Sequence, residues 1–142
     1  MRILLYAKAL EQYAVRLKDA IKIYFPEEEI EVYKTVKSLS ARLRQPVEDP
    51  EMAILLISNR NDLMDILSIQ HFFRDTPIIL FTPDNEAETI ALAHQLRPRF
   101  LSDLQGDFRV VTEVLKKWSK TKKRGEKNVS ENFSTPGRIG SG

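Results

Sequence analysis

The chain has 142 residues, of which 42% are hydrophobic and 30% charged, so its length suits one globular domain. It has no cysteine, which excludes disulfides, thiolate nucleophiles and cysteine metal sites, and no apolar run near the roughly 18–20 residues that cross a bilayer. We expect a reducing, cytoplasmic location. The net charge of +2 is uneven, because residues 119–142 hold six basic and two acidic residues, leaving 16 and 18 in 1–118.

The first half of the chain alternates apolar runs with segments of helical periodicity. Residues 2–6 predict a strand, and apolar residues at three- and four-residue steps from Leu10 to Tyr24 predict a helix that ends before Pro26. Residues 30–33 alternate apolar and charged side chains, which is typical of a half-covered edge strand. A brief helix with Val36, Leu39 and Leu43 facing inward should follow.

The second half continues this alternation. Residues 52–57 and 77–81 are apolar without alternation and predict central strands that are buried on both faces. Between them, Asn61 or Asp62 can cap a helix that carries an apolar stripe ending at Phe73. Asp84 can cap a fourth helix. A short fifth strand over 99–101 and a last helix from Asp107 complete the pattern.

Five successive strand–helix units predict an α/β flavodoxin-like fold, a (βα)5 three-layer sandwich around a parallel five-stranded sheet. The common strand order for such a domain is 2-1-3-4-5, which opens a crevice where the carboxyl ends of the strands meet. We therefore expect one domain over 1–118 with any site at that edge. Residues 119–142 are too polar to bury an apolar face, so they predict a disordered basic tail or linker.

Glycine is missing from the turns that would bind phosphate. All five glycines lie at or after Gly106, beyond the fifth predicted strand. A phosphate-binding turn between strand and helix generally needs glycine, so that the backbone can approach the ligand closely. The sequence therefore argues against a P-loop or a dinucleotide site, and we expect no cofactor.

Several segments of 1–118 resemble bacterial response-regulator receiver domains of the CheY-like family. Residues 3–8 resemble the opening strand and turn in which two adjacent acidic residues bind Mg²⁺, and residues 52–58 resemble the strand that ends in the phosphorylated aspartate. The run from Thr76 to Thr82 resembles the strand that ends in the switch threonine or serine. Residues 99–103 resemble the segment in which an aromatic residue precedes a functional lysine.

The resemblance fails at most of the positions that carry the chemistry. The positions of the vestigial pocket are Ala7 and Lys8 in place of the acidic pair, Ile57 or Ser58 in place of the phospho-acceptor, Asp103 in place of the lysine, and the retained Thr82 and Phe100. Aspartyl phosphorylation needs a carboxylate nucleophile, a divalent cation and a lysine to offset the phosphoryl charge. We therefore expect a degenerate pseudo-receiver without catalytic residues.

Other polar residues have ordinary structural interpretations. Asp62, Asp65, Asp84 and Glu86 could form a displaced acidic site, but helix capping explains them better. His71 and His94 lack the spacing of metal ligands, so no metal site is expected. Ser58 has no evident histidine and acidic partners for nucleophilic catalysis. We further expect Lys8 to point into the crevice and to pair with Asp103 or Asp84, although both ends could simply reach solvent.

The favoured interpretation is a non-catalytic module in bacterial signal transduction that binds a protein partner or a second copy of itself. The resemblance implies a partner face on the fourth helix, the fifth strand and the last helix, where mixed charge suits a reversible interface. That face would comprise Glu86, Glu88, Gln95, Arg97, Arg99, Arg109, Glu113 and Lys116. Two alternatives stay open: a nucleic-acid-associated regulator that uses the basic tail, and an enzyme with an unusual site in the crevice.

Overall fold

The computed structural model describes residues 2–46 and 50–118 and divides the chain into two units, 1–108 and 109–142. The elements of the first unit are β1 (Arg2–Ala7), α1 (Glu11–Tyr24), β2 (Glu29–Tyr33), α2 (Val36–Leu43), β3 (Met52–Leu56), α3 (Arg60–Leu67), a 3₁₀ turn (Gln70–Phe72), β4 (Ile78–Thr82), α4 (Ala87–His94) and β5 (Phe100–Asp103). In the second unit, residues 109–118 are helical. The predicted tail, 119–142, lies outside the described residues.

The sheet is parallel and has the strand order β2-β1-β3-β4-β5, which confirms the predicted flavodoxin-like topology. In register, Ala7 pairs with Leu56, Leu56 with Phe81, and Thr82 with Asp103. The carboxyl ends of β1, β3, β4 and β5 therefore meet at one edge, where the strand order predicts a site.

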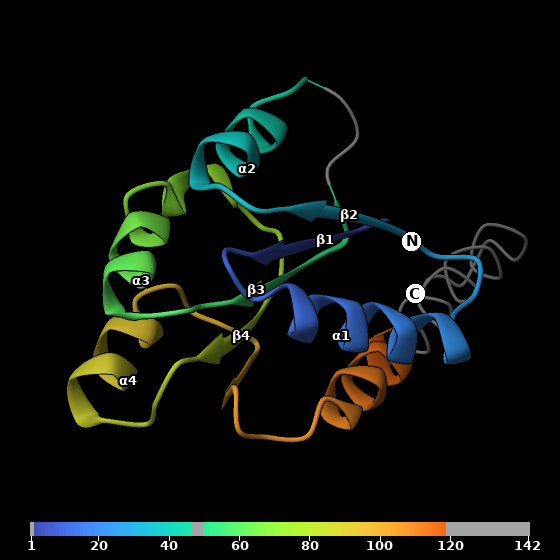
Figure 1. Ribbon diagram of the computed structural model, residues 1–142. Helices are drawn as coiled ribbons and strands as arrows, with labels where there is room; N and C mark the ends of the chain where they lie inside the picture. The colour runs from blue at the N-terminus through green and yellow to red at the C-terminus, as the bar shows by residue number, and fades with distance from the viewer. Residues whose placement is uncertain (1, 47–49, 119–142) are drawn as a thin grey trace, which may run out of the picture. The chain divides into compact units, whose positions relative to one another are not determined.

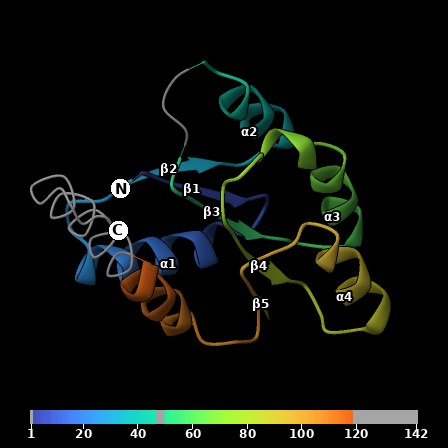
Figure 2. The same ribbon diagram turned by 180° about the vertical axis from the view of Figure 1, so that it is seen from behind.

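Helices of the first unit cover both faces of the sheet, as the long apolar runs require. Figures 1 and 2 show α1 against one face and α2, α3 and α4 against the other. Alternation along β1 follows this division, because Leu4 and Tyr6 pack with Leu39 of α2, Leu63 of α3 and Ala93 of α4. All residues of β3 and β4 are buried, so these are the central strands that the apolar runs predict.

Two helix caps differ from the sequence-based predictions. Asn59, and not Asn61 or Asp62, caps α3, because its side chain accepts a hydrogen bond from the N–H of Asp62. Glu86, and not Asp84, is the N-cap residue of α4. The carboxylate of Asp84 instead accepts a hydrogen bond from the N–H of Glu86 at 2.9 Å and shapes the turn before the helix.

Two element boundaries also differ. Phe73 lies beyond α3, after the 3₁₀ turn, although it is buried in the same core as Leu63. The fifth strand runs to Asp103 and not to Leu101, because its parallel pairing with β4 continues as far as Thr82. Within the described part of the chain, no helix is long and apolar enough to span a bilayer.

Candidate functional site

The carboxyl edge of the sheet is formed largely by buried side chains. Ala7, Ile57 and Thr82 are each fully buried or nearly so at the ends of β1, β3 and β4. Ile57 belongs to the core beneath α2–α4, whereas Ser58 is half-exposed. Of the two residues that the sequence leaves open for the acceptor position, Ser58 is therefore the one that reaches the surface.

Lys8 does not form the predicted ion pair. Its side chain is exposed on the turn after β1 and, among the described residues, takes part in no ion pair or hydrogen bond. Both expected partners are engaged locally. The carboxylate of Asp103 accepts a hydrogen bond from the N–H of Gln105 at 2.9 Å, and that of Asp84 accepts one from the N–H of Glu86. The prediction that Lys8 pairs across the crevice is wrong, because each carboxylate is held in a turn of its own.

A buried carboxylate lies directly beneath this edge. Asp62, in the first turn of α3, is only 2% exposed. Its Oδ1 accepts a 2.5 Å hydrogen bond from the hydroxyl of Tyr6, and its Oδ2 accepts bonds from both the N–H and the Oγ–H of Ser58 at 3.0 Å. The amino-terminal turn of a helix also favours a negative charge. Asp62 therefore ties the ends of β1 and β3 to α3.

The network explains the titration behaviour of Tyr6. Burial raises the pKa of the Tyr6 phenol well above its ordinary value of 10.0, and the hydrogen bond to Asp62 and the charge of that carboxylate raise it further. Tyr6 thus remains a protonated donor throughout the neutral range. We interpreted Asp62 from sequence only as a cap or first-turn charge, since nothing in the local pattern reveals a partner 56 residues away.

Thr82 holds the position that resembles the receiver switch residue. Its side chain is buried, and its hydroxyl donates to the carbonyl oxygen of Asp84 at 2.6 Å, with the carbonyl oxygen of Ser102 at 3.3 Å. Both acceptors belong to the main chain. The hydroxyl therefore links the end of β4 to β5 and to the turn before α4. The aromatic Phe100, half-buried, pairs in register with Ile79 at the start of β5.

Arg60 joins α3 to α4 through three partners. Its guanidinium contacts Glu86 at 3.0 Å and Glu88 at 2.9 Å, and it donates to the buried hydroxyl of Thr89 at 3.1 Å. Glu86 and Glu88 were predicted to be part of the partner face. In the structure both are exposed and contact Arg60, and their place in the partner face stays a prediction.

The other predicted residues of the partner face divide between the two units. Gln95, Arg97 and Arg99 are exposed in the first unit. Arg109, Glu113 and Lys116 belong to the helical residues of the second unit, where Lys116 contacts Glu113 at 3.4 Å. Among the described residues, no three histidine or acidic side chains come together in a way that could hold a metal ion.

Comparison with known proteins finds the same fold in solved structures. No protein-family model and no curated protein sequence matches the chain. A CheY-like receiver domain from Methanospirillum hungatei superposes with a TM-score of 0.68 at 14% identity, over 87% of this chain and 97% of its own. The N-terminal domain of a response regulator from Carboxydothermus hydrogenoformans superposes with a TM-score of 0.65 at 12% identity, over 88% of this chain and 98% of its own.

A third match extends this result. The N-terminal receiver domain of a two-component response regulator from Bacteroides fragilis gives a TM-score of 0.58 at 20% identity, over 80% of this chain and 92% of its own. The chain shares the flavodoxin-like fold of these solved structures. Within this fold, the carboxyl edge that the sheet topology marks as a site is the edge occupied by Ser58, Thr82 and Asp103.

Proposed function

We propose that this protein is a pseudo-receiver: a non-catalytic, cytoplasmic module of bacterial signal transduction that binds a protein partner and is not controlled by aspartyl phosphorylation. The observation that carries the proposal is the state of the Asp62 carboxylate, which contacts Ser58 just beyond the end of β3. Asp62 is buried, and both of its oxygens are engaged: one accepts a hydrogen bond from Tyr6 and the other accepts from Ser58. A carboxylate held in this way is shielded from a phosphodonor.

The neighbouring positions support the same proposal. A phosphoryl group on a carboxylate is stabilised by a divalent cation with oxygen ligands and by a lysine. Ala7 and Lys8 follow β1 where the cation would need acidic ligands, and Asp103 ends β5 where the lysine would lie. The charges at these positions would repel the cation on one side and the phosphoryl group on the other.

Fixed contacts around the edge support a module with one stable conformation. The hydroxyl of Thr82 is bonded to main-chain carbonyl oxygens, and Arg60 fastens α3 to α4 through Glu86 and Glu88. Such contacts can keep the loops at the strand ends in place without phosphate or metal. For partner binding we propose the exposed polar residues that follow α4, namely Gln95, Arg97 and Arg99. Exposed polar side chains of this kind suit a reversible protein contact.

The proposal can be tested with a phosphoryl mimic. The full chain, labelled with ¹⁵N, is titrated with Mg²⁺ and then with beryllofluoride while the amide resonances are followed. We expect no localised shifts at Ser58, Asp62, Thr82 or Asp103. A saturable change centred on these amides, dependent on Mg²⁺, would show that the edge binds a phosphoryl group and would overturn the proposal.

A further inference from the structure

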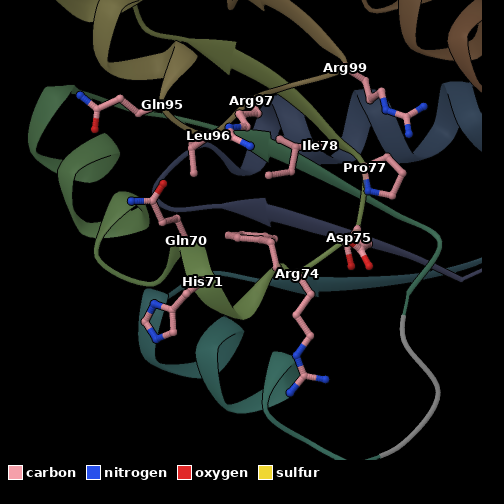
Figure 3. Close-up of a pocket in the computed structure, with 12 residues that line it drawn as sticks. Gln70, His71, Arg74, Asp75, Pro77, Ile78, Gln95, Leu96, Arg97 and Arg99 are labelled. Carbon is pink, nitrogen blue, oxygen red and sulfur yellow. The ribbon is translucent and has the colours of Figure 1, made fainter.

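A cavity opens at the amino ends of the strands, on the opposite side of the sheet from the Asp62 network. It has a volume of about 390 Å³ and lies where β4 begins, between the 3₁₀ turn and the end of α4. Phe73, Ile78 and Leu96, all buried, form its apolar floor. Figure 3 shows the polar residues around it. This volume falls in the range of about 300–1,000 Å³ that is usual for small-molecule sites.

The rim of this cavity is predominantly basic. Arg74, Arg97 and Arg99 line it, with Asp75 as the only acidic lining residue. Within the described part of the chain, the guanidinium groups of Arg74 and Arg97 take part in no ion pair or hydrogen bond. Guanidinium groups bind carboxylate and phosphate oxygens in a two-pronged geometry. The free N–H donors of Arg74 and Arg97 therefore match an anionic ligand.

The backbone at two of these arginines is unfavourable for any residue that carries a Cβ atom. Arg74 and Arg97 both have a φ of 52°, and only one other described residue that is not glycine, Ala9, has a positive φ. Each of the two arginines follows a helical segment, at a place where glycine is common because it adopts this conformation without steric cost. Arginine stands at both places, at a steric cost that glycine would avoid.

Arg74 and Arg97 do not converge on one point. Figure 3 shows the Arg74 side chain pointing away from Arg97. Gln95, the C-cap residue of α4, also lines the cavity, so the partial negative charge at that helix end faces it. This charge disfavours a single small anion, which would contact only one of the arginines. A ligand with two or more anionic groups offers a separate group to each arginine.

We propose that this cavity binds a small polyanion, a ligand that carries at least two phosphate or carboxylate groups. Arg97 and Arg74 contact separate anionic groups, and the floor formed by Ile78 and Leu96 packs against the body of the ligand. The proposal goes beyond the pseudo-receiver function. It does not depend on the loss of phosphorylation, since the carboxyl edge shares none of these residues, but Gln95, Arg97 and Arg99 also belong to the proposed partner face, so a polyanion and a protein partner would compete there.

The test is an NMR titration of the full chain at constant ionic strength. Tripolyphosphate and citrate serve as polyanions, and inorganic phosphate is the single-group comparison. We expect at least one polyanion to shift the amides of 70–78 and 95–99 with an affinity about tenfold above that of phosphate, the gain expected from a second charged contact. Tripolyphosphate alone would indicate a phosphorylated ligand, and citrate alone a polycarboxylate.

The variant Arg97→Gly separates binding from folding, because glycine adopts a φ of 52° without strain. We expect its melting temperature to equal or exceed that of the wild type while polyanion affinity falls about tenfold, the effect of losing one charge-assisted contact. Ala9→Gly relieves a similar conformation elsewhere, and Lys18→Ala removes an exposed positive charge from α1; both should retain full affinity.

Three results would overturn the proposal. The first is no localised shift with either polyanion at about 10 mM, a concentration that detects even weak binding. The second is an equal loss of affinity in Lys18→Ala and Arg97→Gly, which would mean that only the overall charge attracts anions. The third is a lower melting temperature in Arg97→Gly with unchanged affinity, which would show that Arg97 serves the fold.

Discussion

The hydroxyl of Tyr6 donates a 2.5 Å hydrogen bond to the carboxylate of Asp62, and this buried contact joins the second-last residue of β1 to the first turn of α3. The same carboxylate accepts two hydrogen bonds from Ser58 at the end of β3. Three elements that meet at the carboxyl edge are thus held by one side chain. The stability of that edge should depend on Asp62 more than on any exposed charge nearby.

Replacing Asp62 with alanine should be strongly destabilising. The change leaves the buried Tyr6 hydroxyl and the partly buried N–H of Ser58 without their acceptor. The expected loss in the free energy of unfolding is roughly 2–4 kcal/mol. Chemical denaturation of the purified chain measures it. Asp62→Asn keeps one acceptor oxygen and nearly the same volume, so it should lose only about 1 kcal/mol.

A double-mutant cycle with Tyr6→Phe provides the control. If the two side chains act through their hydrogen bond, the coupling energy between the two substitutions should be about 1 kcal/mol or more. The reason is that substitutions at two residues that share a buried contact do not have additive effects on stability. Additive effects would show that Asp62 and Tyr6 stabilise the edge independently.

Stability should fall at alkaline pH because of Tyr6. Burial, followed by the hydrogen bond and charge of Asp62, raises the pKa of Tyr6 in the folded chain above 10.0, while the unfolded chain keeps the ordinary value. The contribution is therefore fully present below pH 10 and is lost as pH rises above it, with a slope of at most about 1.4 kcal/mol per pH unit for one proton. Denaturation curves between pH 8 and 11 measure this slope. Tyr6→Phe should have a smaller slope than the wild type, and an equal slope would contradict the assignment.

The contact between α3 and α4 should depend on Arg60. Arg60→Ala removes two ion pairs and the donor to the Thr89 hydroxyl. Because the ion pairs are partly exposed, the global loss should be about 1 kcal/mol or less. The clearest effect should be faster amide hydrogen exchange across α4, which measures local opening. Arg16→Ala is a matched control, since Arg16 lies over Tyr13 and Phe108 and away from α4. Equal rates of amide exchange across α4 in both variants would show that Arg60 does not hold α4 to α3.

Sequence periodicity predicted the fold correctly because the apolar patterns on this chain are long and unambiguous. The buried runs of β3 and β4 and the alternating edge strand β2 lie where the pattern placed them. Caps and boundaries were less accurate. Asn59 competes with Asn61 and Asp62 for the same capping position, and only the backbone conformation at residue 59 decides between them.

The candidate site was predicted only in part, for a different reason. The missing acidic residues at the ends of β1 and β3 can be read directly from Ala7, Lys8 and Ser58. The network around Asp62 cannot be read from the sequence, because it depends on a tyrosine near the end of an apolar strand that bonds to α3. The predicted pairing of Lys8 failed because Asp84 and Asp103 bond to the main chain of their own turns.

Restoring one acidic residue should not restore a metal site. Lys8→Asp introduces a carboxylate on an exposed turn, but no second strand-end carboxylate lies beside it on β1 or β3. Mg²⁺ retains most of its water and needs several well-placed oxygens. Isothermal titration should therefore detect no binding at millimolar Mg²⁺. Tight binding by this single variant would show that Lys8 alone disables an otherwise intact site.

The central claim, that this receiver fold is not phosphorylated, is tested most directly by intact-mass spectrometry after incubation of the full chain with acetyl phosphate and Mg²⁺. We predict an unchanged mass and no base-labile phosphate, because the Asp62 carboxylate is buried and hydrogen-bonded and no other carboxylate ends β3. A stoichiometric gain of one phosphoryl group, mapped to Asp62 or to another aspartate of the carboxyl edge, would contradict the account.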